Sequence, residues 1–455
     1  MFANKNLETA VAYSANQDHT GGHMTKKEFK EAMLRGLGRC VIAVQKEPEK
    51  YRDMVLWACK QDIAYDAQSE GTRAWYVAAM VSAYPDPETF IGAAAEALKK
   101  HRSNGSWNFL HLCELLMLFA MDGSETAKQA LEEKYQELLE RMLARKRRPD
   151  RMFHELSDLE QLGLVLAADK SSFVRIARDF GRLYREKSYL EDGDFAWFFS
   201  AKGGQYRKTM ERAAETDEYI ACFLQRERAS IAAREELSNR RRENLRNNLQ
   251  GARLSRWLSR QADQETIEQY AAAYRDQTQP EQRAEALTAF AWCPYPDDPQ
   301  PILADTQSDC EELRPAAWQA LERIRHVAVR QFALDNAERG VRDPENFALL
   351  ATNYISKDGP LLESLLREQI AAKDWDGVHA TGLDIYRIFD EHIGKPRPKH
   401  LLPLLYEYNP CSFCRKSALE YMSKYRMLTK DILEECRFDS NDEIRQFAEK
   451  RLRDN

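Results

Sequence analysis

The sequence predicts an all-α protein, and three observations support this fold class. Apolar residues recur at the i, i+3, i+4 and i+7 spacing of amphipathic helices along most of the chain. Alternating, β-branched stretches bounded by turns, which would indicate strands, are almost absent. The 455 residues include only 19 Gly and 16 Pro, and 43% of them are hydrophobic and 31% charged. This composition is typical of a folded, helix-rich chain.

The first 23 residues stand apart from this pattern. They lack the basic region followed by an apolar one that defines a secretory signal. The letters GGHM at 21–24 are what a ribosome-binding site followed by a start codon would encode, and an expression scar would look similar. We therefore expect 1–23 to be disordered or to precede the true start, with Met24 beginning the folded chain.

Residues 24–220 are predicted to form an N-terminal array of amphipathic helices. Phe29, Met33 and Leu37 illustrate the helical spacing near its start, and Gly-, Pro- and Asp-containing turns separate the helical stretches. The most apolar stretch, 109–121, is shorter than the roughly 20 residues that span a bilayer, and it contains charged and His side chains. We interpret it as a buried helix and predict no membrane contact.

Four polar residues crowd into one short part of this array, beside aromatic side chains: Asp66, Gln68, Glu70 and Arg73. Such a cluster could form a surface for a partner or a ligand. The alternative is a turn and a helix cap, with the aromatic residues in the core.

Residues 221–262 are interpreted as an Arg-rich helical connector. Between 224 and 260 the chain holds ten Arg and no Lys against four Glu, a net charge of +6, whereas the whole chain has a formal net charge of −6. The connector could bind nucleic acid, with Arg contacting phosphates and Trp stacking on a base. The alternative is a solvated helix face whose Arg pair with the Glu of the same stretch. The residues that would bind nucleic acid are Arg240, Arg241, Arg242, Arg246 and Trp257.

From residue 263 to 455 the sequence repeats itself at a period near 30. The segments around Arg283 and Arg314 align at an offset of 31, and those around Arg415 and Arg445 align at an offset of 30. A period of this length with two helices per unit predicts an α-solenoid. Stacking lets neighbouring helix pairs bury apolar faces that no pair buries alone.

The repeated pattern is an acidic turn, an aliphatic residue, Arg, and then Ala and an aliphatic residue. It resembles the HEAT-type repeat, in the short form common in bacterial proteins. The resemblance is clearest over 263–455 and implies a superhelix of helical hairpins. We expect the repeated Arg to reach an acidic group in the turn of a neighbouring unit.

Cys411 and Cys414 form the strongest chemical signal in the chain. Together with Cys436 and His400 they could bind zinc, and a CxxC at a helix start could be redox-active. The repeat alignment instead gives Cys414 an aliphatic core position, and the chain has only one CxxC. We predict a structural role, with no metal and no cofactor.

No common enzyme motif of the GxGxxG, P-loop, HExxH or GxSxG type is present in the sequence. The nine cysteines are scattered and odd in number, unlike a secreted disulfide framework, so we expect reduced thiols and a cytoplasmic location. We predict a non-catalytic α-solenoid scaffold that binds a protein partner on its concave face. Two alternatives stay open: a nucleic-acid-binding or DNA-repair-type HEAT-like protein that uses the Arg-rich region, and a metal or redox module at the CxxC.

Overall fold

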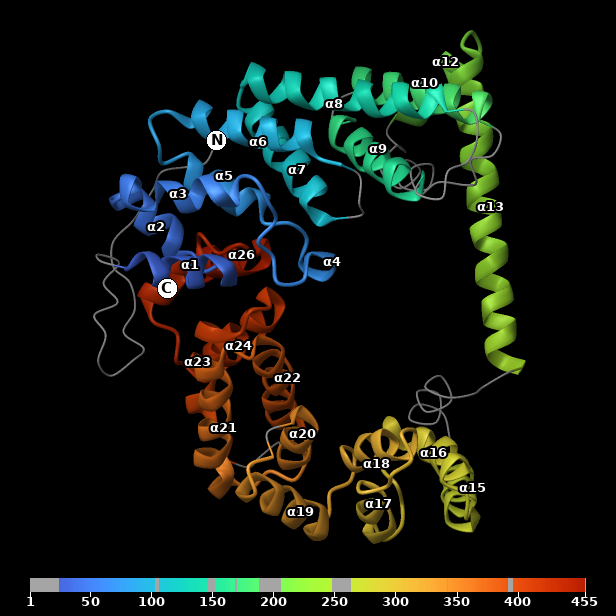
Figure 1. The fold of residues 1–455 in the computed structure, drawn as a ribbon, viewed down its shortest axis with the longest axis vertical. Coiled ribbons are helices and arrows are strands. Elements are labelled where there is room, and N and C mark those ends of the chain that lie inside the picture. Colours follow the sequence, from blue (N-terminus) through green and yellow to red (C-terminus); the bar gives the residue numbers. More distant parts are fainter. Residues whose placement is uncertain are drawn as a thin grey trace. The chain divides into compact units, whose positions relative to one another are not determined.

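The computed structural model describes residues 24–102, 106–145, 152–167, 170–187, 206–247, 263–341, 343–391 and 396–454. Every regular element in these ranges is a helix (Figure 1), which confirms the all-α prediction for the described part of the chain. The prediction for residues 1–23 lies outside the described residues. The chain divides into two compact units, unit 1 (Met1–Arg240 with Thr429–Asn455) and unit 2 (Arg241–Leu428).

Unit 1 contains the N-terminal helices and the last two helices of the chain. Its helices are α1 (Lys26–Arg35), α2 (Arg39–Lys46), α3 (Pro48–Ala58), α4 (Ala67–Glu70), α5 (Ala74–Val81), α6 (Pro87–Lys100), α7 (Trp107–Met121), α8 (Glu125–Ala144), α9 (Met152–Leu166), α10 (Lys170–Glu186), α12 (Arg207–Ala214), α13 (Glu218–Asn247), α25 (Lys430–Cys436) and α26 (Asp442–Asp454). Helix α13 continues past the end of unit 1 into the residues assigned to unit 2.

Helices α5, α7 and α9 form a row in unit 1. Helix α5 packs on α7 and α7 packs on α9, while α6 and α8 pack on each other beside the row. Helix α7 covers the stretch predicted to be buried, and seven of its residues, including Phe109 and Leu116, are buried. Helix α1 begins with a capping box, in which Thr25 and Glu28 satisfy each other's backbone N–H groups. It ends at Gly36, whose φ of 75° is left-handed.

The last helical hairpin, α25–α26, packs against the turn between α1 and α2. The Ser440 N–H donates to the Gly36 carbonyl at 2.9 Å, and Arg39 Nε lies 2.9 Å from Glu435 Oε1. A Cβ atom on Gly38 would lie 1.9 Å from the Glu435 carbonyl oxygen, so only glycine allows this approach. The sequence division placed these two helices with the rest of 263–455, whereas their contacts join them to unit 1.

Unit 2 is a succession of helical hairpins. Its helices are α15 (Gln264–Asp276), α16 (Pro280–Thr288), η2 (Ala289–Ala291), α17 (Gln300–Asp305), α18 (Leu313–Leu321), α19 (Val327–Glu338), α20 (Pro344–Thr352), η3 (Ser356–Asp358), α21 (Gly359–Ala372), α22 (Trp375–Glu391), η4 (Lys399–Leu401), α23 (Leu402–Tyr408) and α24 (Ser412–Lys424). The two helices of each hairpin, such as α17 and α18, pack on each other. The second helices also pack in order, α16 on α18, α18 on α20, α20 on α22 and α22 on α24.

A turn with the same hydrogen bond precedes three helices that carry a repeated Arg. In each turn a side-chain oxygen accepts the N–H group of the residue two positions further on, which fixes the chain direction at the helix entry. The acceptors and donors are Ser308 Oγ with Cys310 (3.2 Å), Asn409 Oδ1 with Cys411 (3.1 Å), and Asp439 Oδ1 with Asn441 (2.9 Å). The sequence offsets of 101 and 30 between these turns therefore correspond to a repeated local structure.

Candidate functional site: an apolar groove in unit 1

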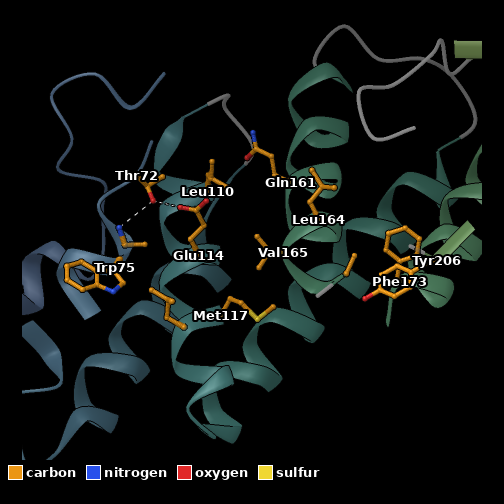
Figure 2. Close-up of a pocket in the computed structure, with 13 residues that line it drawn as sticks. Thr72, Trp75, Leu110, Glu114, Met117, Gln161, Leu164, Val165, Phe173 and Tyr206 are labelled. Carbon is orange, nitrogen blue, oxygen red and sulfur yellow. Dashed lines mark hydrogen bonds between the residues drawn. The ribbon is translucent and has the colours of Figure 1, made fainter. Parts of the chain in front are cut away.

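The candidate site is a groove of about 830 Å³ along the row α5, α7 and α9 of unit 1 (Figure 2). Trp75 lies toward one end, and Phe173 and Tyr206 lie together toward the other, with ring centroids 4.7 Å apart. The volume falls in the range of about 300–1,000 Å³ that is typical of ligand sites. The lining consists of Thr72, Ala74, Trp75, Leu110, Glu114, Met117, Leu118, Gln161, Leu164, Val165, Ala167, Phe173 and Tyr206.

The lining side chains form helical stripes. On α7, Leu110, Glu114 and Met117 follow the i, i+4, i+7 spacing of one helix face, and Leu164 and Val165 of α9 lie across the groove from them. All five are partly exposed, whereas the opposite face of α7 is fully buried in the unit. Helix α7 is therefore apolar on two faces, one for the core and one for the groove.

Polar groups in the groove are few. The Glu114 carboxylate accepts a hydrogen bond from the Thr72 hydroxyl, and the Thr72 hydroxyl oxygen accepts the Ala74 N–H at 3.4 Å (Figure 2). Gln161 adds an amide to the lining. The groove can thus receive apolar groups along its length, and the carboxylate of Glu114 gives it a negative charge.

The C-terminal helix α26 packs against Trp75, which lines the groove. The Arg445 guanidinium lies 3.6 Å from the centre of the Trp75 ring, which is a cation–π contact. Arg445 also donates to the carbonyl oxygens of Asp439 (2.8 Å) and Ser440 (3.0 Å). Burial lowers the pKa of Arg445 from its usual value, although neighbouring carboxylates raise it. Residues at the two ends of the sequence therefore build one wall.

A second hollow, of about 510 Å³, lies in unit 2 and has a different lining. Its charged residues include Glu322, Arg323, Arg325 and Glu391. Arg325 Nη2 lies 2.6 Å from Glu391 Oε2, and Arg323 Nε donates to a backbone carbonyl of η2 at 3.2 Å. Burial raises the pKa of Glu322. Because these charged side chains already pair within the protein, they offer a ligand fewer charged groups to bind.

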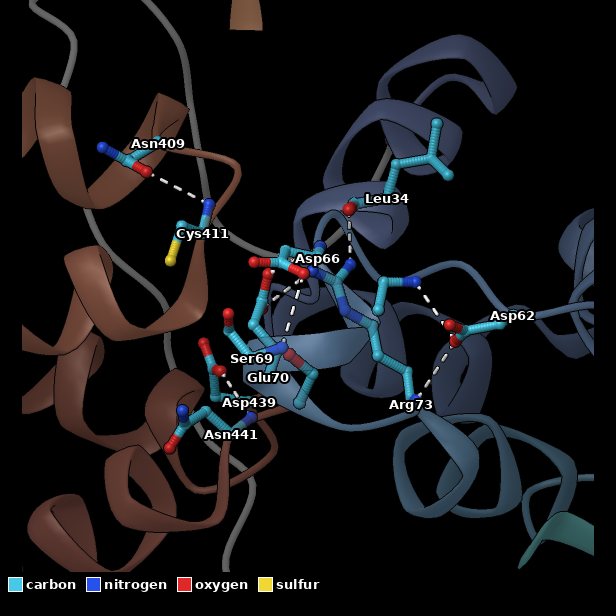
Figure 3. A network of polar contacts seen from close by, with 12 residues as sticks. Leu34, Asp62, Asp66, Ser69, Glu70, Arg73, Asn409, Cys411, Asp439 and Asn441 are labelled. Carbon is cyan, nitrogen blue, oxygen red and sulfur yellow. Dashed lines mark hydrogen bonds and ion pairs between the residues drawn. The ribbon is translucent and has the colours of Figure 1, made fainter. Parts of the chain in front are cut away.

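The predicted partner surface at 66–73 is largely used inside unit 1 (Figure 3). Arg73 is 2% exposed and donates through Nη1 to the Met33 carbonyl at 3.3 Å, and its Nη2 lies 3.5 Å from Glu70 Oε2. Asp66 caps α4 by accepting a backbone N–H at 3.4 Å. Gln68 is exposed. The same stretch contributes Thr72, Ala74 and Trp75 to the groove, which lie between or just after the predicted residues.

Among the repeated Arg, Arg283 joins neighbouring hairpins of unit 2. Its Nη2 lies 2.6 Å from Asp305 Oδ2 on α17 and donates to the Tyr274 hydroxyl at 2.8 Å. The Tyr274 hydroxyl donates to the same Asp305 oxygen at 2.6 Å. Burial and the Asp305 carboxylate raise the pKa of Tyr274. The acidic partner of Arg283 thus lies on a helix of the neighbouring hairpin, whereas the expectation placed it in a turn.

The other repeated Arg have different surroundings. Arg314 is exposed and donates to the Ser308 carbonyl at 3.0 Å, six residues upstream. Arg445 makes the equivalent bond to Asp439, also six residues upstream. Arg415 is fully buried. In two units the aligned Arg therefore donates to a backbone carbonyl of the turn before its own helix. Its burial differs between units because its tertiary surroundings differ.

The predicted nucleic-acid contacts fall mostly outside the described residues. Arg240 is exposed on α13, and its Nη2 lies 2.5 Å from Glu236 Oε1, four residues earlier. Arg241, Arg242 and Arg246 continue the same helix, but their side chains lie outside the described residues, as does all of Trp257. An i, i+4 ion pair of this kind is expected on a solvated helix face.

The CxxC pair is placed beside a histidine that the sequence did not single out. The ligand atoms of His379, Cys411 and Cys414 all lie within 4.8 Å of one another. His400 Nε2 instead lies 3.5 Å from a glutamate carboxylate of α21, and Cys436 is buried in α25 of unit 1. Cys414 is buried, in agreement with the core position that the repeat alignment gives it.

Comparison of the chain with protein-family models, with curated proteins and with solved structures found no match. Within the described ranges, no helix combines the length and the apolar character needed to cross a bilayer. The groove residues had two signals in the sequence. One is the polar and aromatic stretch that contains Thr72 and Trp75, and the other is the stretch 109–121, which is apolar on several faces yet contains Glu114. Its partners on α9 and α10 carry no such signal.

Proposed function

We propose that this protein is a non-catalytic helical-repeat scaffold whose unit 1 groove binds a segment of a protein partner. In this proposal unit 2 is an α-solenoid of HEAT-like hairpins. The ordered packing of α16, α18, α20, α22 and α24 supports it, as do the repeated turns at Ser308, Asn409 and Asp439. The groove itself supports the binding role.

The observation that carries the binding role is the band of partly exposed apolar side chains on the neighbouring helices α7 and α9. Leu110, Met117, Leu164 and Val165 lie along one groove instead of being scattered, and isolated exposed apolar residues would need no explanation. An amphipathic segment inserts its apolar side chains into grooves of this kind. Glu114 favours a basic residue in the partner, because among the described lining residues it alone is acidic.

A displayed library of random peptides, selected against the full-length protein, tests this proposal. We expect the enriched peptides to combine several aliphatic or aromatic side chains with a Lys or Arg. Val165→Arg places a long cation in the middle of the groove and should abolish binding of the enriched peptides. Glu114→Gln should preserve apolar enrichment and remove the preference for a basic residue.

The matched control is Val327→Arg, which makes the same chemical change at a valine of unit 2 that is 77% exposed and outside the groove. It should bind the selected peptides as the unaltered protein does. Equal binding by the Val165→Arg and Val327→Arg proteins would overturn the proposal, and so would a selection that yields no enrichment. Circular dichroism of both variants establishes that they remain folded.

A further inference from the structure

We propose that His379, Cys411 and Cys414 of unit 2 bind a thiophilic divalent cation, Zn²⁺, with one coordination position left for water or an added ligand. Two thiol sulfurs and an imidazole nitrogen are the donors that Zn²⁺ takes in proteins. The three ligand atoms lie within 4.8 Å of one another, and Cys411 and Cys414 are 6% and 5% exposed. This site is independent of the groove in unit 1.

The spacing of the donors is close to that of a metal centre. Tetrahedral Zn²⁺ with Zn–S bonds of about 2.3 Å holds two sulfurs about 3.8 Å apart. Closing the observed spacing requires movements of roughly 1 Å, which side-chain rotation supplies without moving the helices. Among the residues that the structure describes, no further His, Cys, Asp or Glu joins the three at this spacing. A tetrahedral ion therefore keeps a fourth position for a ligand from outside.

Hydrogen bonds of Asn409 and Tyr386 hold the cysteine segment against the helix that carries His379. The buried Asn409 side chain accepts the Cys411 N–H at 3.1 Å and donates from Nδ2 to the Val378 carbonyl at 3.5 Å. It thereby links the first cysteine to the residue that precedes His379. The Tyr386 hydroxyl donates to the Cys414 carbonyl at 2.6 Å and fixes the second cysteine to the same helix, α22. Outer hydrogen bonds of this kind orient metal ligands.

This arrangement also depends on a glycine in α22. A Cβ atom on Gly382 would lie 2.5 Å from Asn409 Nδ2, so glycine is the residue that lets the amide reach between α22 and α24. Cys411 is the N-cap residue of α24. The positive end of a helix favours the thiolate form that metals require, and the next residue after Cys414, the buried Arg415, adds a positive charge.

Spectroscopic titration of the reduced, full-length protein with Co²⁺ tests the site, because thiolate ligation gives Co²⁺ an intense charge-transfer absorption. We expect one equivalent to bind and Zn²⁺ to displace it. His379→Gln, Cys411→Ser and Cys414→Ser should each lose the absorption or weaken binding at least about tenfold. Cys310→Ser is the matched control, since Cys310 is a partly exposed cysteine of the same unit outside the cluster, and it should titrate unchanged.

A second variant separates metal binding from folding. Asn409→Ser keeps an acceptor for the Cys411 N–H, as Ser308 does in its own turn, but removes the donor to the Val378 carbonyl. It should remain folded and bind Co²⁺ about 10- to 100-fold more weakly. The site is overturned if the unaltered protein shows no charge-transfer absorption. It is also overturned if the three ligand variants titrate like Cys310→Ser, or if Cys411 and Cys414 form a disulfide and take up no metal after reduction.

Discussion

The row α5, α7 and α9 of unit 1 and the row α18, α20 and α22 of unit 2 each consist of helices that pack on their neighbours, but the two rows differ in chemistry. The first row lines an apolar groove, and one carboxylate, that of Glu114, belongs to its described lining. The second carries a charged cluster in which Glu322 and Arg323 follow α18 and Asp384 and Arg387 lie on α22. Arg387 Nη2 lies 2.8 Å from Asp384 Oδ1 and also donates to the Ala348 carbonyl of α20 at 3.1 Å.

The difference shows that helix stacking does not decide what a row of helices binds. In unit 1 the side chains on the exposed face of α7 remain partly open, so their apolar area is available to a partner. In unit 2 Asp384 pairs with Arg387, and Arg387 and Arg323 also donate to backbone carbonyls. Function therefore has to be assigned from the side chains of each surface and not from the repeat architecture. Three predictions test how far this contrast extends to stability.

The largest effect is expected from Asp305→Ala in unit 2. The change leaves the Arg283 guanidinium and the Tyr274 hydroxyl without their shared acceptor, and breaking such a largely buried pair costs about 3 kcal/mol. Arg314→Ala removes an exposed Arg at the aligned position and should change stability by less than about 0.5 kcal/mol. Hydrogen exchange of the α15–α18 amides measures both. Equal losses in the two variants would contradict the view that charge pairs between hairpins stabilise unit 2.

A somewhat smaller loss is expected from Gly38→Ala in unit 1. The added methyl group would lie 1.9 Å from the Glu435 carbonyl oxygen, so the α25–α26 hairpin has to shift, at a cost of about 2 kcal/mol. Hydrogen exchange of residues 430–454 should accelerate selectively.

The control for this variant is Gly92→Ala in α6, where an added methyl group meets no atom within 4 Å. It should increase the free energy of unfolding of unit 1 by about 0.4–1 kcal/mol, because it restricts the unfolded chain. If Gly38→Ala also stabilises unit 1, the inference that the last hairpin packs closely on the first helices is wrong.

The smallest effect is a pH dependence in unit 2. Burial raises the pKa of Asp384 to about 7, while Arg387 and Arg323 lower it and Glu322 raises it. In the unfolded chain an Asp titrates near pH 3.9. The folded state therefore binds this proton more tightly, and the stability that it contributes below about pH 4 is lost as the pH rises to about 7.

Asp384→Asn should reduce the loss of thermal stability between pH 5 and pH 8, since the amide does not titrate. Asp335→Asn, at an exposed position of α19, is the matched control and should retain the dependence of the unaltered protein. An identical pH dependence in all three proteins would show that Asp384 is ionised throughout and paired with Arg387.

Helices and their buried faces could be predicted from the sequence because they depend on local periodicity. Phe29 and Met33 are fully buried in α1, the stretch 109–121 forms α7, and Cys414 is buried at its aligned position. The alignment of Arg415 with Arg445 likewise corresponds to matching turns before their helices. Each of these features needs only residues within about one hairpin of one another.

The chain by itself determined its all-α class, the position of most helices and the repeated turns, because backbone hydrogen bonding and amphipathic spacing act over a few residues. Only the tertiary structure brought Arg445 against Trp75, joined the last hairpin to Gly36 and Gly38, and set His379 beside the CxxC. These contacts join residues about 30 to 400 positions apart in the chain, and nothing in local sequence spacing records which helix faces will meet. The packing of helices against one another determined these contacts.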